Sequence, residues 1–189
     1  MGLGNPGAEF AGTRHNVGAD AVSLLAARHG GQLKSEKGLH AGATTVSIAG
    51  RRVMMAVPSV YMNESGVAVG PLVRRAGLAE GAGLAALVVV HDELDLPSGR
   101  VKLKVGGGNA GHNGLKSIDN HLHGRDYLRV RIGIGKPPGR QPGADYVLKR
   151  PGTAERADLE VAEAVAADAV EAIASEGIEA AMNRFNSLS

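Results

Sequence analysis

The sequence predicts an α/β sandwich built around a mixed sheet. Segments of helical and of strand periodicity alternate along the 189 residues, which is typical of helices packed on a sheet. Residues 86–93 ("ALVVVHDE") are almost continuously apolar, as in a strand buried on both faces. Two strand-like segments, 44–50 and 51–58, meet at Gly50 as a hairpin. Because a hairpin is antiparallel, the predicted sheet is mixed rather than all-parallel.

Each element is predicted from its own spacing of apolar residues. Helical segments repeat apolar side chains every three or four residues and stop near glycine, whereas half-buried strands alternate apolar and polar side chains. The Pro-rich segment 135–143 ("GKPPGRQPG") is expected to be a surface loop. In chain order we expect helix 19–30, strands 44–50 and 51–58, helix 64–77 with a bend at Gly70-Pro71, strands 86–93 and 99–108, a loop entering a helix within 111–124, strand 127–135, a short strand after the loop, and helices 153–176 and 178–185.

The long alanine-rich helix near the C-terminus is expected to place Val161, Val165 and Ile173 on one apolar stripe and to end at Gly177. No internal repeat or low-complexity linker divides the chain. Its length is natural for one domain with a sizeable core. We therefore expect residues 1–189 to form a single domain.

Composition excludes several classes of protein. The chain has no cysteine, which excludes disulfides, zinc–thiolate sites and thiol nucleophiles. No apolar run approaches the ~20 residues of a membrane span, and the start lacks the pattern of a signal peptide. With 43% hydrophobic and 21% charged residues, the sequence is typical of a globular protein, and we expect it in the cytoplasm without membrane attachment.

Positive charge is concentrated in the middle of the chain. The formal net charge is +2, but residues 98–150 hold 11 Lys and Arg against 3 Asp and Glu. Residues 151–189 hold 2 against 8. This asymmetry indicates one face that meets a polyanion, while the alternative is charge scattered over the surface.

Two strands of the basic block carry their charges on single faces. Arg100, Lys102 and Lys104 share one face of the first strand, and Arg129 and Arg131 share one face of the second. If the strands lie close together in the sheet, these faces form a patch suited to phosphates. The alternative is a solvated face that only aids solubility.

Two glycine-rich segments resemble phosphate-binding loops. "GLGNPG" (2–7) matches G-x-G-x-x-G, but a dinucleotide loop needs a strand before it and a helix starting within it, and Met1 alone precedes Gly2. "GGGNAGHNG" (106–114) lacks the G-K-[ST] ending of a P-loop. Neither segment predicts nucleotide binding. The second is either a flexible hinge or a place where backbone and neutral side chains approach a ligand.

One candidate catalytic segment, "HDELD" (91–95), directly follows the apolar strand, where open α/β sheets line their ligand crevices. Asp92 fits either as the partner that orients a histidine base or as a metal ligand together with His91, Glu93 and Asp95. No G-x-S-x-G elbow occurs, which disfavours a serine hydrolase.

Three asparagines, Asn5, Asn63 and Asn113, lie beside glycines in loop-like contexts. Any one of them alone is most often a turn residue. Together with His15 and Asp92 they form a set of neutral hydrogen-bonding groups around one acid/base pair. Such a set suits polarising a carbonyl and placing a water, without a metal or a covalent intermediate.

Five segments, in this order, closely resemble bacterial peptidyl-tRNA hydrolases: "GLGNPGAEFAGTRHNVG", "PSVYMNESGVAV", "HDELDLPSGRVKLKVGGGNAGHNGLKSI", "RVRIGIGKPPGR" and "AAMNRFN". The resemblance extends over essentially the whole chain. It implies a monomeric single-domain enzyme with a three-layer α/β/α sandwich, a central twisted mixed sheet and no cofactor. The implied reaction hydrolyses the ester between a peptide, or an N-blocked amino acid, and the 3′-terminal ribose of tRNA, which rescues the tRNA for translation.

The resemblance also implies the site residues. The catalytic positions fall on His15, Asp92 and Asn5, with no metal ligand among them. The positions that bind the peptide and the acceptor end of tRNA fall on Phe10, Tyr61, Met62, Asn63, His112 and Asn113, and the clamp for the tRNA 5′-phosphate falls on Lys104 and Arg131.

The sequence departs from the family pattern at three places. An apolar strand usually precedes "GLGNPG", and here it is reduced to Met1, so either the start is misassigned or truncated or the first strand is unusually short, and we expect a less stable fold. Phe10 stands where a tyrosine is usual, so a hydroxyl contact to tRNA is lost while ring stacking is kept. Ala110 stands where a glycine is common, which narrows the approach of the backbone. None of these changes removes a catalytic group.

Two other functions remain compatible with the residues alone. A tRNA-binding protein without activity would keep the basic patch, although intact His15 and Asp92 argue against it. A metallohydrolase would use His91, Asp92 and Glu93, and strong chelators would inhibit it.

Overall fold

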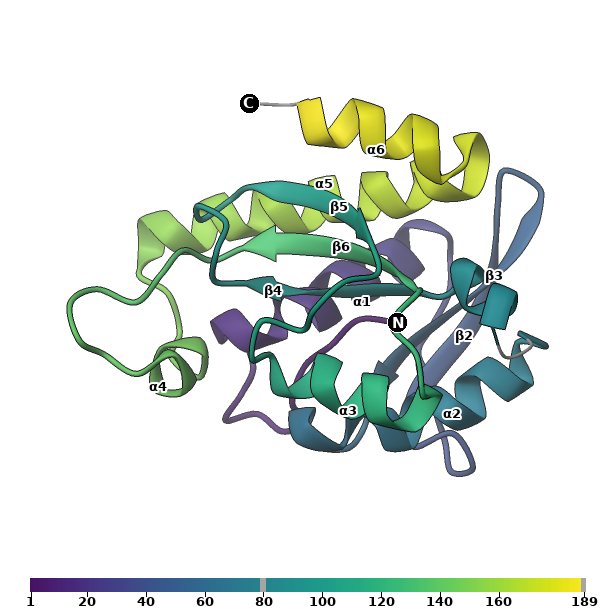
Figure 1. Cartoon of the computed structure of the whole chain (residues 1–189), viewed down its shortest axis with the longest axis horizontal. Coiled ribbons are helices and arrows are strands. Elements are labelled where there is room, and N and C mark those ends of the chain that lie inside the picture. The colour runs from purple at the N-terminus through teal and green to yellow at the C-terminus, as the bar shows by residue number, and fades with distance from the viewer. Residues whose placement is uncertain (79–80, 188–189) are drawn as a thin grey trace.

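Figure 1 shows the computed structural model of the chain, which describes residues 1–78 and 81–187. Its strands form two three-stranded sheets. The first is antiparallel, in the order β1-β2-β3: β1 (Lys34–Glu36), β2 (Ala41–Ile48) and β3 (Arg51–Pro58). The second has the order β4-β6-β5, with β4 (Val88–Glu93) parallel to β6 (Leu128–Gly133) and β5 (Val101–Val105) antiparallel to it. Mixed pairing is therefore present in the sheet β4-β6-β5, whereas the hairpin that was expected to make the sheet mixed belongs to the separate antiparallel sheet.

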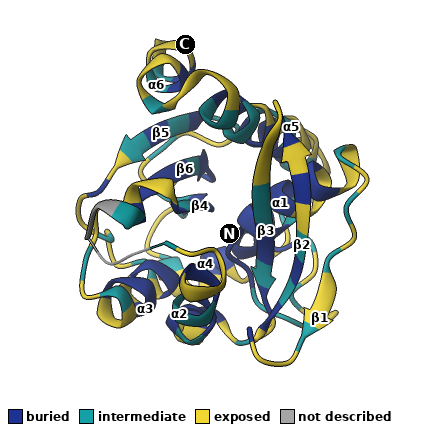
Figure 2. Ribbon diagram, turned by 90° about the vertical axis from the view of Figure 1, so that its right-hand side faces the viewer, coloured by how far each residue is buried: buried dark blue, intermediate teal, exposed yellow. Residues whose placement is uncertain are grey.

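Residues 1–3 connect the two sheets. The Gly2 N–H donates to the Ala56 carbonyl of β3 at 2.9 Å, and the Leu3 N–H donates to the Val90 carbonyl of β4 at 2.9 Å. Gly2 forms a parallel bridge with Val90. Figure 2 shows the N-terminus between β3 and β4 accordingly. Residues 1–3 thus join the two sheets through backbone hydrogen bonds and a single bridge at Gly2.

Glycines let the first helix, α1 (Val17–Arg28), lie directly against this bridge. A Cβ on Gly2 would lie 2.2 Å from the Gly18 carbonyl oxygen, and a Cβ on Gly18 would lie 2.2 Å from the Val90 carbonyl oxygen. Only glycine permits such an approach of one backbone to another. Because His15 immediately precedes α1, this packing also sets its distance from β4.

Helices cover both faces of the sheets (Figure 1). α1 packs with α5 (Thr153–Glu176) on one face, and α2 (Ser65–Arg75) packs with α3 (Asn113–Leu122) on the other. α6 (Ile178–Ser187) lies along β5, and the short helices are η1 (Arg14–Asn16), η2 (Met62–Glu64), η3 (Gly81–Ala86) and α4 (Gly143–Val147). The expected α/β/α sandwich is confirmed. None of the helices within residues 1–78 and 81–187 is long and apolar enough to cross a membrane.

The buried face of α5 differs from the expected stripe. Val161 is 65% exposed, and Val165 and Ile173 are only half-buried. Leu159 and a row of alanines are buried instead: Ala162, Ala166, Ala167, Ala169 and Ala172. Because alanine side chains are small, the face of α5 that carries them packs close to α1. The larger valines lie at the edge of this contact.

Two short elements also differ from the sequence prediction. Residues 143–147 form helix α4, where a short strand was expected, because Tyr146 and Val147 turn inward and the Tyr146 hydroxyl donates to the Ile134 carbonyl at 2.8 Å. β1 was not expected at all. Its three residues are polar and carry no apolar alternation, so only pairing with β2 identifies them as a strand.

Candidate active site

A cavity of about 490 Å³ lies at the carboxyl end of β4. His15 from η1, Asp92 from β4, and His112 and Asn113 at the start of α3 contribute to its lining. A larger cavity of about 660 Å³ lies beside Met1 and is lined mainly by aliphatic side chains of β3, α1 and α5. Since its lining includes no candidate catalytic residue, the cavity at β4 is the candidate active site.

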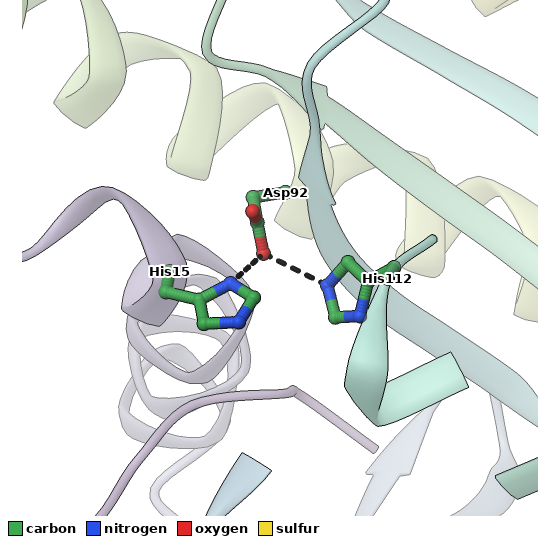
Figure 3. Close-up of side chains that lie close together, drawn as sticks. All are labelled: His15, Asp92 and His112. Atoms are coloured by element: carbon green, nitrogen blue, oxygen red, sulfur yellow. Dashed lines mark hydrogen bonds and ion pairs between the residues drawn. The ribbon is translucent and has the colours of Figure 1, made fainter. Parts of the chain in front are cut away.

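His15 and Asp92 form a buried pair (Figure 3). His15 Nδ1 lies 2.8 Å from Asp92 Oδ1, and the two residues are 8% and 3% exposed. A carboxylate only accepts hydrogen bonds, so Nδ1 carries the hydrogen. In the neutral ring, Nε2 is then left with a free lone pair, which is the arrangement a general base requires.

His112 binds the same carboxylate oxygen. Its Nε2 lies 3.0 Å from Asp92 Oδ1, on the other side from His15 (Figure 3). Burial by itself raises the pKa of Asp92, but its interactions with the two imidazoles that donate hydrogen bonds to it, His15 and His112, outweigh burial and hold the pKa well below its usual range. Asp92 is therefore ionised at physiological pH.

The same three side chains are the one group within the described residues that could supply three metal ligands, with their ligand atoms within 4.8 Å of one another. Their nitrogen–oxygen distances of 2.8 and 3.0 Å are ordinary hydrogen-bond lengths, so shared protons account for the cluster. His91 does not join it. Its Nδ1 donates to the Asp92 backbone carbonyl at 2.6 Å, and burial lowers the pKa of the ring to about 3. The expected alternative of His91, Asp92 and Glu93 as a ligand set is not assembled here.

Arg14 fixes the segment that carries His15, and sequence reasoning did not identify it. Its guanidinium donates two bonds to the Glu155 carboxylate, at 2.7 and 2.6 Å, and lies 4.1 Å from the centre of the Tyr146 ring. These contacts attach η1 to α4 and α5. The available signal was an arginine directly beside the candidate base in "GTRHNVG".

Asn5 is held in a defined orientation. Its side-chain oxygen accepts from the Met62 N–H at 2.7 Å. Its backbone exchanges two 2.9 Å hydrogen bonds with the side chain of Asn16, the residue after His15. Asn16 was missed by sequence reasoning. These contacts connect Asn5 to both η1 and η2, although Asn5 is not part of the cavity lining.

The residues around Asn5 differ in exposure. Tyr61 is 54% exposed, and its ring meets Phe10 edge to face at 6.2 Å between centroids. Asn63 and Asn113 are exposed, at η2 and at the first turn of α3. Met62 is only 4% exposed and belongs to the apolar core between α2 and α3, so its side chain supports η2 from beneath. Met62 as a lining of the peptide groove remains a prediction.

β5 and β6, the two strands that carry the basic side chains, are neighbours in the sheet, which is the condition for their basic faces to form one patch. Lys102 pairs with Arg131 and Lys104 with Arg129, so the four side chains share one face of β5 and β6. Arg129, however, is 2% exposed and donates to the carbonyls of Gly107 and Gly108 at 2.8 and 2.7 Å. Its expected place in an exposed patch is wrong, because it is buried holding the glycine-rich loop.

The remaining basic side chains of this face are placed differently. The Lys102 ammonium donates to the Asn186 carbonyl of α6. The Arg131 side chain is 23% exposed and lies 3.7 Å from Glu93, which lines the cavity. Lys104 is half-buried on the same face. Lys104 and Arg131 as the clamp for a phosphate remain a prediction.

The sequence profile of the family described as peptidyl-tRNA hydrolase matches residues 1–189. The chain belongs to the peptidyl-tRNA hydrolase family. Two relatives named peptidyl-tRNA hydrolase come from Mycobacterium avium (strain 104) and Cutibacterium acnes (strain DSM 16379 / KPA171202). Each is 48% identical to this chain, and each alignment covers 99% of this chain and 96% of the relative. The crystal structure of peptidyl-tRNA hydrolase from Acinetobacter baumannii matches it with a TM-score of 0.90 and 37% identity, over 98% of this chain and 92% of that one.

Family membership confirms the resemblance inferred from the five sequence segments. It also identifies the reaction: this peptidyl-tRNA hydrolase family member is a hydrolase that acts on the ester bond of peptidyl-tRNA and releases the tRNA.

Proposed function

We propose that His15 is the general base that activates water for hydrolysis of the peptidyl ester, with Asp92 orienting it. The observation that carries this proposal is the 2.8 Å hydrogen bond between the two side chains in the wall of the cavity at β4. Nε2 of His15 takes a proton from water as the oxygen attacks the ester carbonyl. The ester C–O bond then breaks, and the proton passes to the leaving ribose oxygen, so the ring returns to its starting state.

We propose that Asn5 recognises the acyl part of the substrate. Because its Oδ1 is occupied by the Met62 N–H, its amide nitrogen is the group left to bind a ligand, and that group can only donate. An amide donor suits a carbonyl oxygen and repels a charged ammonium. This polarity favours a blocked nitrogen over a free α-amine, with Asn63 and Asn113 as further neutral partners along the peptide.

Replacing the Asn5 amide is expected to weaken this discrimination. In Asn5→Ala, the ratio of kcat/KM for N-acetyl-aminoacyl-tRNA to that for free aminoacyl-tRNA should fall about tenfold, the value of one hydrogen bond. Asn5→Asp should lower it further, because a carboxylate attracts the ammonium. Asn120→Ala, at an exposed asparagine of α3, is the matched control. An unchanged ratio in both Asn5 variants would remove Asn5 from this role.

We propose that the acceptor end of tRNA binds across the exposed face next to the cavity. The Phe10–Tyr61 pair offers aromatic surface on which unpaired terminal bases stack. Lys104 and Arg131 bind the tRNA 5′-phosphate on the shared face of β5 and β6. Arg131 lies 3.7 Å from Glu93, which lines the cavity, and this supports a clamp close to the cavity wall.

The Lys104→Ala/Arg131→Ala double variant is expected to raise KM for full-length peptidyl-tRNA. The logarithmic salt dependence of binding should flatten by about two units, one for each lost phosphate contact. Lys34→Ala/Lys37→Ala removes the same charge around β1, at the far side of the molecule (Figure 2), and should leave both quantities near their starting values. On a minimal substrate without the 5′-phosphate, the double variant should keep its kcat/KM. An equal loss on both substrates would contradict the clamp.

We further propose that residues 1–189 act as a single domain and as a monomer. The backbone hydrogen bonds that residues 1–3 make to both sheets support one continuous unit. Peptidyl-tRNA is a product of translation, so the cytoplasm is the compartment in which we expect the enzyme to meet it.

A further inference from the structure

Both ring nitrogens of His112 form hydrogen bonds, and the bonds at Nδ1 determine that Nε2 is the donor. Its Nδ1 lies 3.1 Å from the Gly114 nitrogen and 3.4 Å from the Leu115 nitrogen, in the first turn of α3. A backbone N–H only donates, so Nδ1 is an unprotonated acceptor that caps the helix. The ring is consequently neutral, with its hydrogen on Nε2.

That hydrogen is directed at Asp92. His112 Nε2 lies 3.0 Å from Asp92 Oδ1, the same oxygen that accepts from His15 Nδ1 at 2.8 Å (Figure 3). The side chains of His112 and Asp92 are 9% and 2% exposed, so water competes little for these bonds. One buried oxygen therefore accepts from two imidazoles that come from separate elements.

We infer that His112 is a positioning residue for hydrolysis: its hydrogen bond to Asp92 holds the carboxylate in place and offsets part of its charge, so that Asp92 orients His15 as the base. The inference rests on the proposed role of His15 as the base. A carboxylate bound to an imidazole favours the charged imidazolium. A second donor on the same oxygen weakens that preference, because the negative charge is shared between two hydrogen bonds.

The other titratable groups around the cavity are neutral or paired, so the hydrogen bond from His112 to Asp92 acts on His15. His91 approaches His112 edge to face at 5.1 Å between centroids, but burial lowers its pKa to about 3, so it is neutral at physiological pH. The other titratable groups around the cavity form ion pairs: Glu93 with Arg131 at 3.7 Å, and Asp95 with Lys136 at 3.1 Å. His112 itself cannot gain a proton without losing its bonds to α3.

Two substitutions test the two hydrogen-bonding functions of the His112 ring separately. His112→Asn places an amide oxygen near the position of Nδ1, so it keeps the cap of α3 and deletes the donor to Asp92. With N-acetyl-aminoacyl-tRNA as substrate, kcat at pH 7 should fall about tenfold, and the acidic limb of the kcat/KM profile should move up by about one pH unit. The melting temperature should stay close to that of the unsubstituted chain.

His112→Gln places an amide nitrogen near the position of Nε2, so it keeps the donor and loses the cap. It should melt at a lower temperature and keep the pH profile of the unsubstituted chain. A purely structural role for His112 predicts the opposite pattern, with His112→Asn unchanged in kcat and pH profile. That pattern would overturn the inference.

The tautomer of His112 in the unsubstituted chain provides a test that does not depend on any variant folding. Two-bond ¹H–¹⁵N spectra should show a protonated Nε2 and an unprotonated Nδ1 between pH 6 and 8. A ring protonated at Nδ1 would overturn the inference. If His15→Ala retains turnover, the proposed function fails. If His15→Ala loses turnover while His112→Asn keeps the original pH profile, only the role of His112 fails.

Discussion

His15→Ala is expected to lower kcat for N-acetyl-aminoacyl-tRNA by ~10²-fold or more, the contribution of one well-placed general base. The substitution removes the only imidazole nitrogen that the Asp92 contact leaves free to accept a proton from water in the proposed reaction. Binding of tRNA should change little, because the proposed clamp lies on β5 and β6. Turnover under saturating substrate and the Kd for deacylated tRNA are the two measurements.

The control for this prediction is His29→Ala, which removes an imidazole at the end of α1 that binds Glu171 at 2.9 Å, away from the cavity. It should keep kcat within a few-fold of the unsubstituted chain. Retention of more than about a tenth of the turnover in His15→Ala would remove His15 as the general base, since a positioned base contributes more than that.

Asp92→Asn is expected to have an effect of similar size, ~10²-fold or more on kcat, by a different route. The amide nitrogen donates where the carboxylate accepted, so His15 is driven to the tautomer with its hydrogen on Nε2 and can no longer take a proton from water. His15 and His112 bind the same oxygen of Asp92, so an amide nitrogen at that position deprives both imidazoles of their acceptor. Measuring kcat together with tRNA affinity separates this effect from misfolding.

Asp95→Asn is the matched control, because it removes the same charge from the same strand end at a side chain that is 63% exposed. A small change in kcat is expected there. If Asp92→Asn were no worse than Asp95→Asn, then orientation of His15 by an anion would not be needed for turnover, and the proposed pair would have to be abandoned.

The secondary structure was largely predictable, because it depends on local spacing. The long helix is bounded by Thr153 and Glu176 as expected, and the hairpin turns at Gly50 between β2 and β3. The family was equally readable, because five long segments occur in a fixed order. Strand alternation also identified Lys102 and Lys104 as sharing a face.

Local spacing was not sufficient where a side chain depends on its neighbours in space. Arg129 and Arg131 alternate identically along β6, yet the first is 2% exposed under the glycine-rich loop and the second faces the rim of the cavity. Val161 has the spacing of a core residue, yet it is 65% exposed because alanines form the contact surface of α5. Periodicity reports which residues share a face, and packing decides what that face meets.

The sequence by itself determined the elements, the family and the types of side chain that the reaction needs. The tertiary structure alone decided that His15 and His112, which lie 77 and 20 residues from Asp92 along the chain, share one oxygen of its carboxylate. It also decided that Asn16 orients Asn5 and that Arg14 attaches η1 to α5. The physical reason is that hydrogen bonds require atoms within about 3 Å and aligned, a condition that depends on how η1, β4 and α3 pack around the sheet and not on the spacing of residues within any one of them.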